Sequence, residues 1–258
     1  MDPNCPMVYG DDPEQKRRKE DSIVAWSLNE YLKYQDPKMF IIFPMVKAAY
    51  QIMKAVQQNL EQTGEAQIKE WFVSGISKRG WTTWMIAATN CTTCVKLAGI
   101  LPLSPIVPNL LEAFKWQWES YDGFTFAIQD YVEIGLMEQL DNPVFVEGIK
   151  LIDPAYFLDQ IAKVPVLSIQ SSDDEFMMFD WTQLWYDNFQ KQCPEVHLLI
   201  APNAEHSLLS NVVEVFTGMG TFIRSISSAQ PRSMRPKYTY TYSNLTGEVE
   251  VTIPADAI

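Results

Sequence analysis

The segment from Glu70 to Asn90, EWFVSGISKRGWTTWMIAATN, most constrains what this chain can fold into. Its first residues, Glu70 to Ser74, form a short apolar run with aromatic and β-branched side chains, which predicts a buried strand. A turn with two glycines and Ser77 follows, and the residues from Trp81 to Thr89 have a spacing that suits a helix and contain no proline. A strand, a glycine-flanked turn with a serine and a helix together predict a nucleophile elbow.

The two glycines of this turn are Gly75 and Gly80. Small residues are expected there, because bulky side chains would collide where the chain folds back between strand and helix. The usual pattern is G-x-S-x-G, and here the second glycine comes one residue late. We expect the Ser77 hydroxyl to project from the turn and the backbone N–H of Lys78, at the helix N-terminus, to donate to a developing oxyanion. A turn serine without a chemical role is the alternative.

Helices and strands alternate on either side of this segment. The residues Glu20–Tyr34 and Pro44–Gln62 have the spacing of amphipathic helices, and helical patterns also cover Thr182–Gln190 and Leu209–Ser225. Further strands are predicted at Cys94–Leu101, Val164–Gln170 and Glu195–Ala201. This alternation predicts an α/β fold with a mostly parallel sheet and helices on both faces.

Two segments depart from the alternation. Residues 109–153 carry many aromatic side chains at helical spacing and few strand signals, so we interpret them as a helical insertion that forms a lid over the site. Ordinary packing of core helices is the alternative. The residues from Lys237 alternate around a turn and predict a β-hairpin. We therefore predict a hydrolase-like domain over residues 1–226 and a hairpin over residues 237–258 that begins an accessory β module.

Charge and hydropathy argue against several classes of function. The net charge of −12 disfavours binding to nucleic acid or to an anionic membrane surface. No apolar run approaches the ~20 residues of a transmembrane helix, so no membrane span is expected. The N-terminal residues also lack the apolar core of a signal peptide.

The cysteines predict no metal site. Cys91 and Cys94 form the one CxxC pattern, and neither a second such pattern nor a histidine pair completes a zinc set. Two buried thiols or a local disulfide is the favoured interpretation. We expect neither a metal ion nor a cofactor.

Two further loops complete a chemical set with Ser77. Asp173 and Asp174 follow one predicted strand and His206 follows the next, and ligands of open α/β sheets bind beyond such strand ends. His206 lies in a polar loop and is favoured over His197, which lies within a predicted strand. The order serine, acid, histidine is that of α/β-hydrolases.

Each member of this set has a defined role. A serine hydroxyl becomes a strong nucleophile when a neutral imidazole takes its proton, and a carboxylate orients that imidazole. Asp174 is our choice for the carboxylate and Asp173 is the second choice. A solvated acidic turn or helix cap is the structural alternative for both. A metal-dependent reaction is disfavoured, because no second histidine lies at a suitable spacing.

The segment GISKRGWTTW resembles the signature of the PhoPQ-activated pathogenicity-related protein family, which includes the autocrine proliferation repressor proteins. Further blocks resemble that family in the same order: Asn4–Tyr9, Glu20–Trp26, Pro44–Ala48, Asp153–Tyr156, Asp174–Phe176 and Pro202–Leu208. The resemblance implies an α/β-hydrolase fold with Ser77, Asp174 and His206 in the triad positions. It also implies export and a poorly defined hydrolytic activity, and some relatives are secreted signals that restrain proliferation.

The chain departs from the family in two places. Family members are longer at the N-terminus, so the strands whose following loop supplies a second oxyanion donor are expected to be missing. The sheet edge left open could pair with another chain and give an oligomer. Residues 101–108 lack the acidic residue that the family tends to have there, so we expect a different substrate pocket.

Two functions remain. The favoured one is a serine hydrolase that cleaves an ester or amide in a small molecule or peptide. The alternative is a secreted signalling protein that binds a cell-surface receptor with little or no catalysis. Arg79 could attract an acidic substrate group, although pairing with a structural carboxylate is favoured, and Trp81 is a weak candidate for substrate contact, with core packing favoured. Secretion is expected from the resemblance alone, with the cytoplasm as the alternative.

Overall fold

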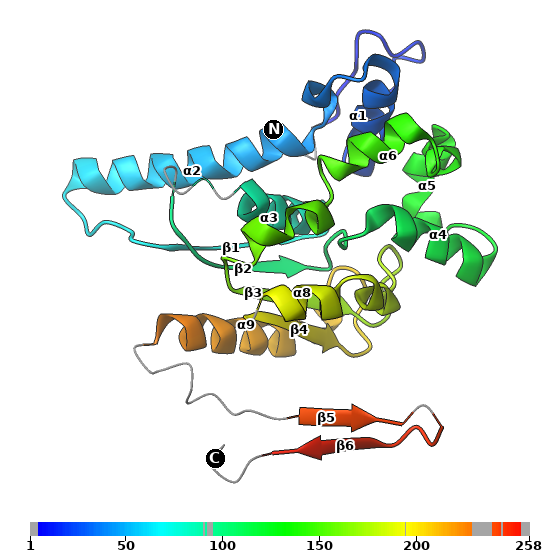
Figure 1. Cartoon of the computed structure of the whole chain (residues 1–258). Helices are drawn as coiled ribbons and strands as arrows, with labels where there is room; N and C mark the ends of the chain where they lie inside the picture. The colour runs from blue at the N-terminus through cyan, green and yellow to red at the C-terminus, as the bar shows by residue number, and fades with distance from the viewer. Residues whose placement is uncertain are drawn as a thin grey trace.

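The structure is a computed structural model of the chain, and it describes residues 5–89, 91, 95–193, 195–228, 239–243 and 245–253. Four parallel strands form its central sheet in the order β1-β2-β3-β4 (Figure 1). They are β1 (Trp71–Ile76), β2 (Leu97–Leu103), β3 (Val166–Ser171) and β4 (Val196–Ala201). All four predicted strands are therefore confirmed, with starts one to three residues later than expected. Within the described residues, β1 is an outer strand of this sheet.

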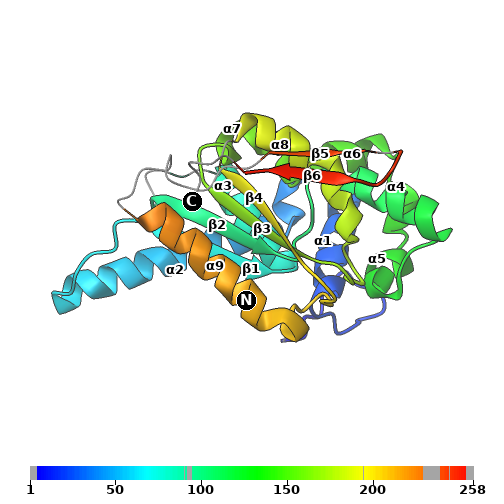
Figure 2. The same cartoon turned by 90° about the horizontal axis from the view of Figure 1, so that it is seen from below.

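Helices cover both faces of the sheet. The helices α3 (Lys78–Thr89), α7 (Leu158–Ile161) and α8 (Tyr186–Gln192) contribute to the core of one face, and α9 (Val212–Ser227) packs against the other (Figure 2). Adjacent residues of β2 point to opposite faces, since Ile100 belongs to the core under α3 and Leu101 to the core under α9. Burial on both faces explains why β2 is an apolar run without polar alternation.

The two predicted N-terminal helices are confirmed as α1 (Asp21–Tyr34) and α2 (Ile42–Thr63), separated by η1 (Pro37–Met39). Pro44 lies in the first turn of α2, where its missing N–H would have no helical partner. Gly64 ends α2 with φ 74°, a conformation that glycine adopts without strain. Tyr50 ties α2 to α3, because its hydroxyl donates to the carbonyl of Ile86 over 2.9 Å.

The segment at residues 109–153 is helical, as predicted. It contains α4 (Leu110–Tyr121), η2 (Phe126–Ile128), α5 (Gln129–Glu133), η3 (Leu136–Gln139) and α6 (Pro143–Lys150). We call it the helical insertion. The buried carboxylate of Asp153 joins its two ends, since it accepts hydrogen bonds from the N–H groups of Asn109, Leu110 and Ala155 at 2.9–3.1 Å. Asp153 also begins η4 (Pro154–Phe157).

Two expectations for the later helices need correction. Residues 182–190 were expected to form one helix, but η5 (Phe179–Leu184) and α8 are separated at Trp185. Trp185 has φ −141°, and its ring is buried against Trp84 and Phe189. Residues 209–211 form η6 (Leu209–Asn211) instead of the start of α9.

The predicted hairpin is present as β5 (Thr239–Tyr242) and β6 (Val249–Thr252), which pair antiparallel. Residues 237–238, 244 and 254–258 lie outside the described part of the chain. Cys91 is disulfide-bonded, whereas Cys94 lies outside the described residues. Across the described residues, no helix combines the length and apolar character needed to cross a membrane.

Candidate active site

Ser77 lies in the turn between β1 and α3 with φ 59°. This left-handed backbone conformation is strained for a residue other than glycine, and such strain concentrates at functional sites. Two backbone hydrogen bonds hold the turn: the Ser77 N–H donates to the carbonyl of Leu103 over 2.9 Å, and the Trp81 N–H donates to the carbonyl of Ser77 over 3.0 Å. A strained serine between a strand and a helix is the geometry of a nucleophile elbow.

Contacts around the turn explain the shifted glycine. A Cβ atom on Gly75 would lie 2.5 Å from the carbonyl oxygen of Arg79, inside any permitted contact. A Cβ atom on Gly80 would lie 2.8 Å from Cβ of Pro105 and 2.9 Å from the carbonyl oxygen of Leu103, both in the segment at the end of β2. Arg79 occupies the usual position of the second glycine, and its side chain is 48% exposed. The crowded position is thus one residue later than in the usual pattern.

The structure brings Asp174 and His206 together. The two carboxylate oxygens of Asp174 lie 2.8 and 2.9 Å from Nδ1 of His206. The Asp174 side chain is 0% exposed, and its Oδ1 also accepts the N–H groups of Phe176 and Met177 at 2.9 and 2.8 Å. Asp173 instead accepts a hydrogen bond from the hydroxyl of Ser172, so the geometry favours Asp174 over Asp173 as the partner of the imidazole.

The second nitrogen of the His206 ring is left without a partner. Its Nε2 atom is buried and makes no hydrogen bond within the described residues. An unsatisfied buried polar atom costs ~1–3 kcal/mol, and a catalytic role is one explanation for its retention. The ring of Phe176 packs against the imidazole with centroids 4.4 Å apart, and the backbone N–H of His206 donates to the carboxylate of Glu175 over 3.1 Å. These contacts hold the ring in one orientation.

Ser77, Asp174 and His206 follow β1, β3 and β4, whose carboxyl ends lie at the same edge of the sheet. Ser77 and His206 both lie within the described residues, and the Ser77 hydroxyl makes no hydrogen bond with His206. Catalytic hydrogen bonds are often long without substrate and tighten in its complex. The structure therefore shows the Asp174–His206 pair and the turn of Ser77 at one edge of the sheet, without a hydrogen bond between them.

The remaining predicted residues have mainly structural contacts. The ammonium of Lys78 lies 2.8 Å from Glu20 and 3.0 Å from Asp21 and is 11% exposed, so it attaches the start of α1 to the elbow. Arg79 lies 3.9 Å from Glu20, which matches the favoured pairing with a structural carboxylate. Trp81 is only 2% exposed and donates from Nε1 to the carbonyl of Ile152 over 2.6 Å. Trp81 therefore occupies the core position that was favoured for it, and the alternative of substrate contact does not fit its burial.

Sequence reasoning missed the residues that support the acid and the histidine. Gln117 of α4 is fully buried, and its Nε2 donates to the carbonyl of Phe176 over 3.4 Å, which ties the helical insertion to the loop that carries Asp174. Hydrogen bonds from the hydroxyls of Ser207 and Ser210 lower the pKa of Glu205 to about 2 and fix the turn next to His206. The contact between Gln117 and Phe176 joins residues so distant in sequence that it leaves no local signal.

Comparisons with known proteins agree with this architecture. Residues 2–258 match the family model described as PhoPQ-activated pathogenicity-related protein. The chain is 33% identical over 261 residues to autocrine proliferation repressor protein A of Dictyostelium discoideum, which covers 99% of this chain and 50% of that protein. The chain thus spans about half the length of this curated relative.

Solved structures with a similar fold include hydrolases. An acylaminoacyl peptidase of Pyrococcus horikoshii matches with a TM-score of 0.52 and 15% identity, over 70% of this chain and 28% of that chain. An esterase of Pyrococcus furiosus matches with a TM-score of 0.44 and 18% identity, over 67% of this chain and 59% of that chain. The first of these likenesses, with the parallel sheet and its flanking helices, confirms the predicted α/β-hydrolase fold.

Proposed function

Because this chain belongs to the PhoPQ-activated pathogenicity-related protein family, we propose that it is a serine hydrolase of ester or amide bonds in a small molecule or peptide. The observation that carries the proposal is how the two ring nitrogens of His206 are hydrogen-bonded. Its Nδ1 is held by the buried carboxylate of Asp174, while its Nε2 is buried and has no hydrogen-bond partner among the described residues, at the sheet edge that carries the strained Ser77. A ring held in this way is prepared to accept one proton.

The proposed reaction follows from these positions. Nε2 of His206 takes the proton of the Ser77 hydroxyl while the Ser77 oxygen attacks the substrate carbonyl. Asp174 stabilises the imidazolium that forms, and the N–H of Lys78, the first residue of α3, donates to the oxyanion. The tetrahedral intermediate then collapses, and the leaving group departs with the proton from His206. Water hydrolyses the acyl-enzyme on Ser77 by the same proton transfers in reverse.

A fluorophosphonate probe tests this proposal, because it reacts with an activated serine. We expect the probe to label the full chain and Ser77→Ala to abolish labelling. Ser74→Ala is the matched control, since Ser74 lies in β1, shortly before the turn that carries Ser77, and its hydroxyl donates to the carbonyl of Leu101. Absence of labelling in folded protein, or equal labelling of the Ser77→Ala variant, would count against a serine hydrolase.

The second candidate is a secreted protein that binds a cell-surface receptor on a hydrolase scaffold. It is favoured by the name of the Dictyostelium relative, a proliferation repressor, and by the disulfide at Cys91, since disulfides persist in oxidising compartments. Binding to cells that is unchanged in Ser77→Ala, together with no ester turnover, would favour this candidate. Pairing of another chain along the outer edge of β1 is a related proposal, and sedimentation equilibrium would detect it.

A further inference from the structure

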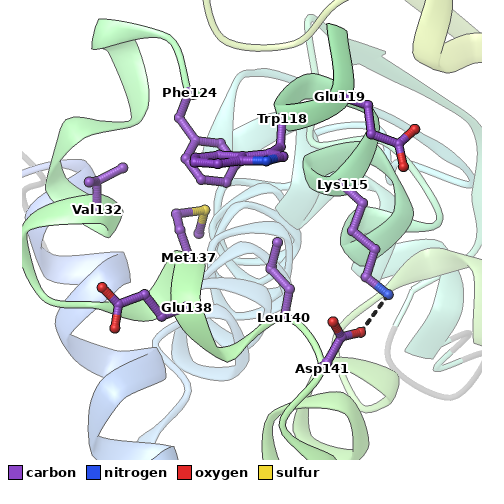
Figure 3. Close-up of a pocket in the computed structure, with 9 residues that line it drawn as sticks. All are labelled: Lys115, Trp118, Glu119, Phe124, Val132, Met137, Glu138, Leu140 and Asp141. Atoms are coloured by element: carbon purple, nitrogen blue, oxygen red, sulfur yellow. Dashed lines mark ion pairs between the residues drawn. The ribbon is translucent and has the colours of Figure 1, made fainter. Parts of the chain in front are cut away.

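The helical insertion contains a cavity of about 540 Å³ between α4, α5 and η3 (Figure 3). Its apolar wall is formed by the rings of Trp118 and Phe124, with centroids 5.1 Å apart, and by Met137 and Leu140. Trp118 remains 50% exposed although its ring borders this cavity. The volume lies within the range of small-molecule sites, ~300–1,000 Å³.

The charges around the cavity are predominantly negative. Three carboxylates and one ammonium line it, those of Glu119, Glu138, Asp141 and Lys115. Two carboxylates balance the positive charge of Lys115, whose ammonium lies 2.8 Å from Asp141 and 3.2 Å from Glu112. The hydrogen bonds to these carboxylates raise the pKa of Lys115. Glu119 and Glu138 make no ion pair within the described residues, and Figure 3 shows Glu119 next to Trp118 and Glu138 next to Met137, at different places on the rim of the cavity.

This combination selects a ligand by chemistry. The face of an indole attracts a cation, and unpaired carboxylates at the rim of the cavity strengthen that attraction and repel an anion. The flexible thioether of Met137 can adapt to an apolar group of irregular shape. We propose that this cavity, which we call the insertion pocket, binds a small organic ammonium ion with an apolar or aromatic body.

The insertion pocket is separate from the candidate active site. Helix α4 presents Lys115, Trp118 and Glu119 to the pocket. A different side of the same helix carries the ring of Phe114, which packs against Trp181, and the amide of Gln117, which bonds to the loop after β3. The proposal therefore stands whether or not Ser77 is catalytic.

Isothermal titration calorimetry of the full chain tests the proposal with three probes of similar ring size. These are benzyltrimethylammonium, neutral benzyl alcohol and anionic phenylacetate. We expect the ammonium to bind at least ~10-fold more tightly than the alcohol, because only the cation gains the ring and carboxylate attractions. Phenylacetate is expected not to bind at millimolar concentration.

Variants locate the binding. Trp118→Ala is expected to weaken ammonium binding by at least ~10-fold, and the double variant Glu119→Gln, Glu138→Gln by a similar factor. Tyr121→Ala is the control on the same helix, since Tyr121 is exposed outside the pocket, and Glu61→Gln on α2 is the control for charge. Both controls should bind as the unaltered chain does.

Three results would overturn the proposal: equal affinity for the ammonium and the alcohol, no ammonium binding at millimolar concentration, or unchanged affinity in both pocket variants. Far-UV circular dichroism and a thermal melt check each variant. The double glutamine variant alters only exposed side chains, so it keeps the test decisive if Trp118→Ala does not fold.

Discussion

Replacing Gly80 by alanine tests whether the turn around Ser77 has the tight packing that an elbow requires. Gly80 lies in the first turn of α3, so alanine should gain ~1 kcal/mol from its better helix propensity. The new Cβ would however lie 2.8 Å from Cβ of Pro105, 2.9 Å from the carbonyl oxygen of Leu103 and 3.0 Å from that of Gly75. Two of these three atoms belong to the backbone and cannot rotate away.

The expected magnitude follows from the two opposing effects. Overpacking of a filled site costs ~1–3 kcal/mol, which equals or exceeds the gain in helix propensity. We therefore expect Gly80→Ala to lower the free energy of unfolding by up to ~2 kcal/mol. Gly220→Ala in α9 is the matched control, because its added Cβ meets no described atom within 4 Å beyond the neighbouring backbone of its own helix, and it should raise the free energy of unfolding by ~1 kcal/mol.

Urea denaturation monitored by circular dichroism measures both changes. The Gly80→Ala variant should also react more slowly with a fluorophosphonate, because a displacement of ~1 Å at a catalytic group can cost ~100-fold in rate. If Gly80→Ala is as stable as Gly220→Ala and is labelled at the unaltered rate, the packing explanation of the shifted glycine is refuted.

Three further predictions address the site and its supports. Asp174→Asn should lower the rate of ester hydrolysis by up to ~10⁴-fold, whereas Asp173→Asn should change it little, and an equal effect would reverse the assignment. Asp153→Ala should lower the free energy of unfolding by ~3 kcal/mol or more, because three backbone N–H groups lose a buried acceptor; a loss below ~1 kcal/mol in urea denaturation would contradict this. The folded-state pKa of Glu205, about 2, lies below its ordinary value of 4.5, so this carboxylate stabilises the fold above pH ~5 and the stabilisation is lost as pH falls towards 2. Glu205→Gln should therefore lose less stability than the unaltered chain between pH 7 and pH 3, and equal losses in urea denaturation would refute this.

The sequence predicted those features that depend on neighbours in the chain. The strand before Ser77 and the helices α1 and α2 follow from periodicity, and the structure confirms them. The break at Trp185 was not predicted, because it depends on burial of that ring against residues of α3 and α8. Tertiary packing here overrides a helical pattern.

In the candidate site, too, features that depend on residue type and order were predictable, and contacts between distant segments were not. The residue types and their order along the chain predict that Asp174 and His206 act together, and the structure shows their contact. The crowding at Gly80 comes from the segment at the end of β2, and Gln117 supports the acid loop from the helical insertion, so neither has a local signature. Trp118 and Phe124 were visible as aromatic residues at helical spacing, but only the fold shows that they border a cavity.

The central claim is that His206 and Asp174 activate Ser77. The most direct test is the second-order rate of fluorophosphonate labelling in the unaltered chain and in His206→Gln, with peptide mapping of the labelled residue. We predict a single adduct on Ser77 and a rate that falls by ~10³-fold or more without the imidazole. An adduct on another serine, or an unchanged rate in His206→Gln, would contradict it.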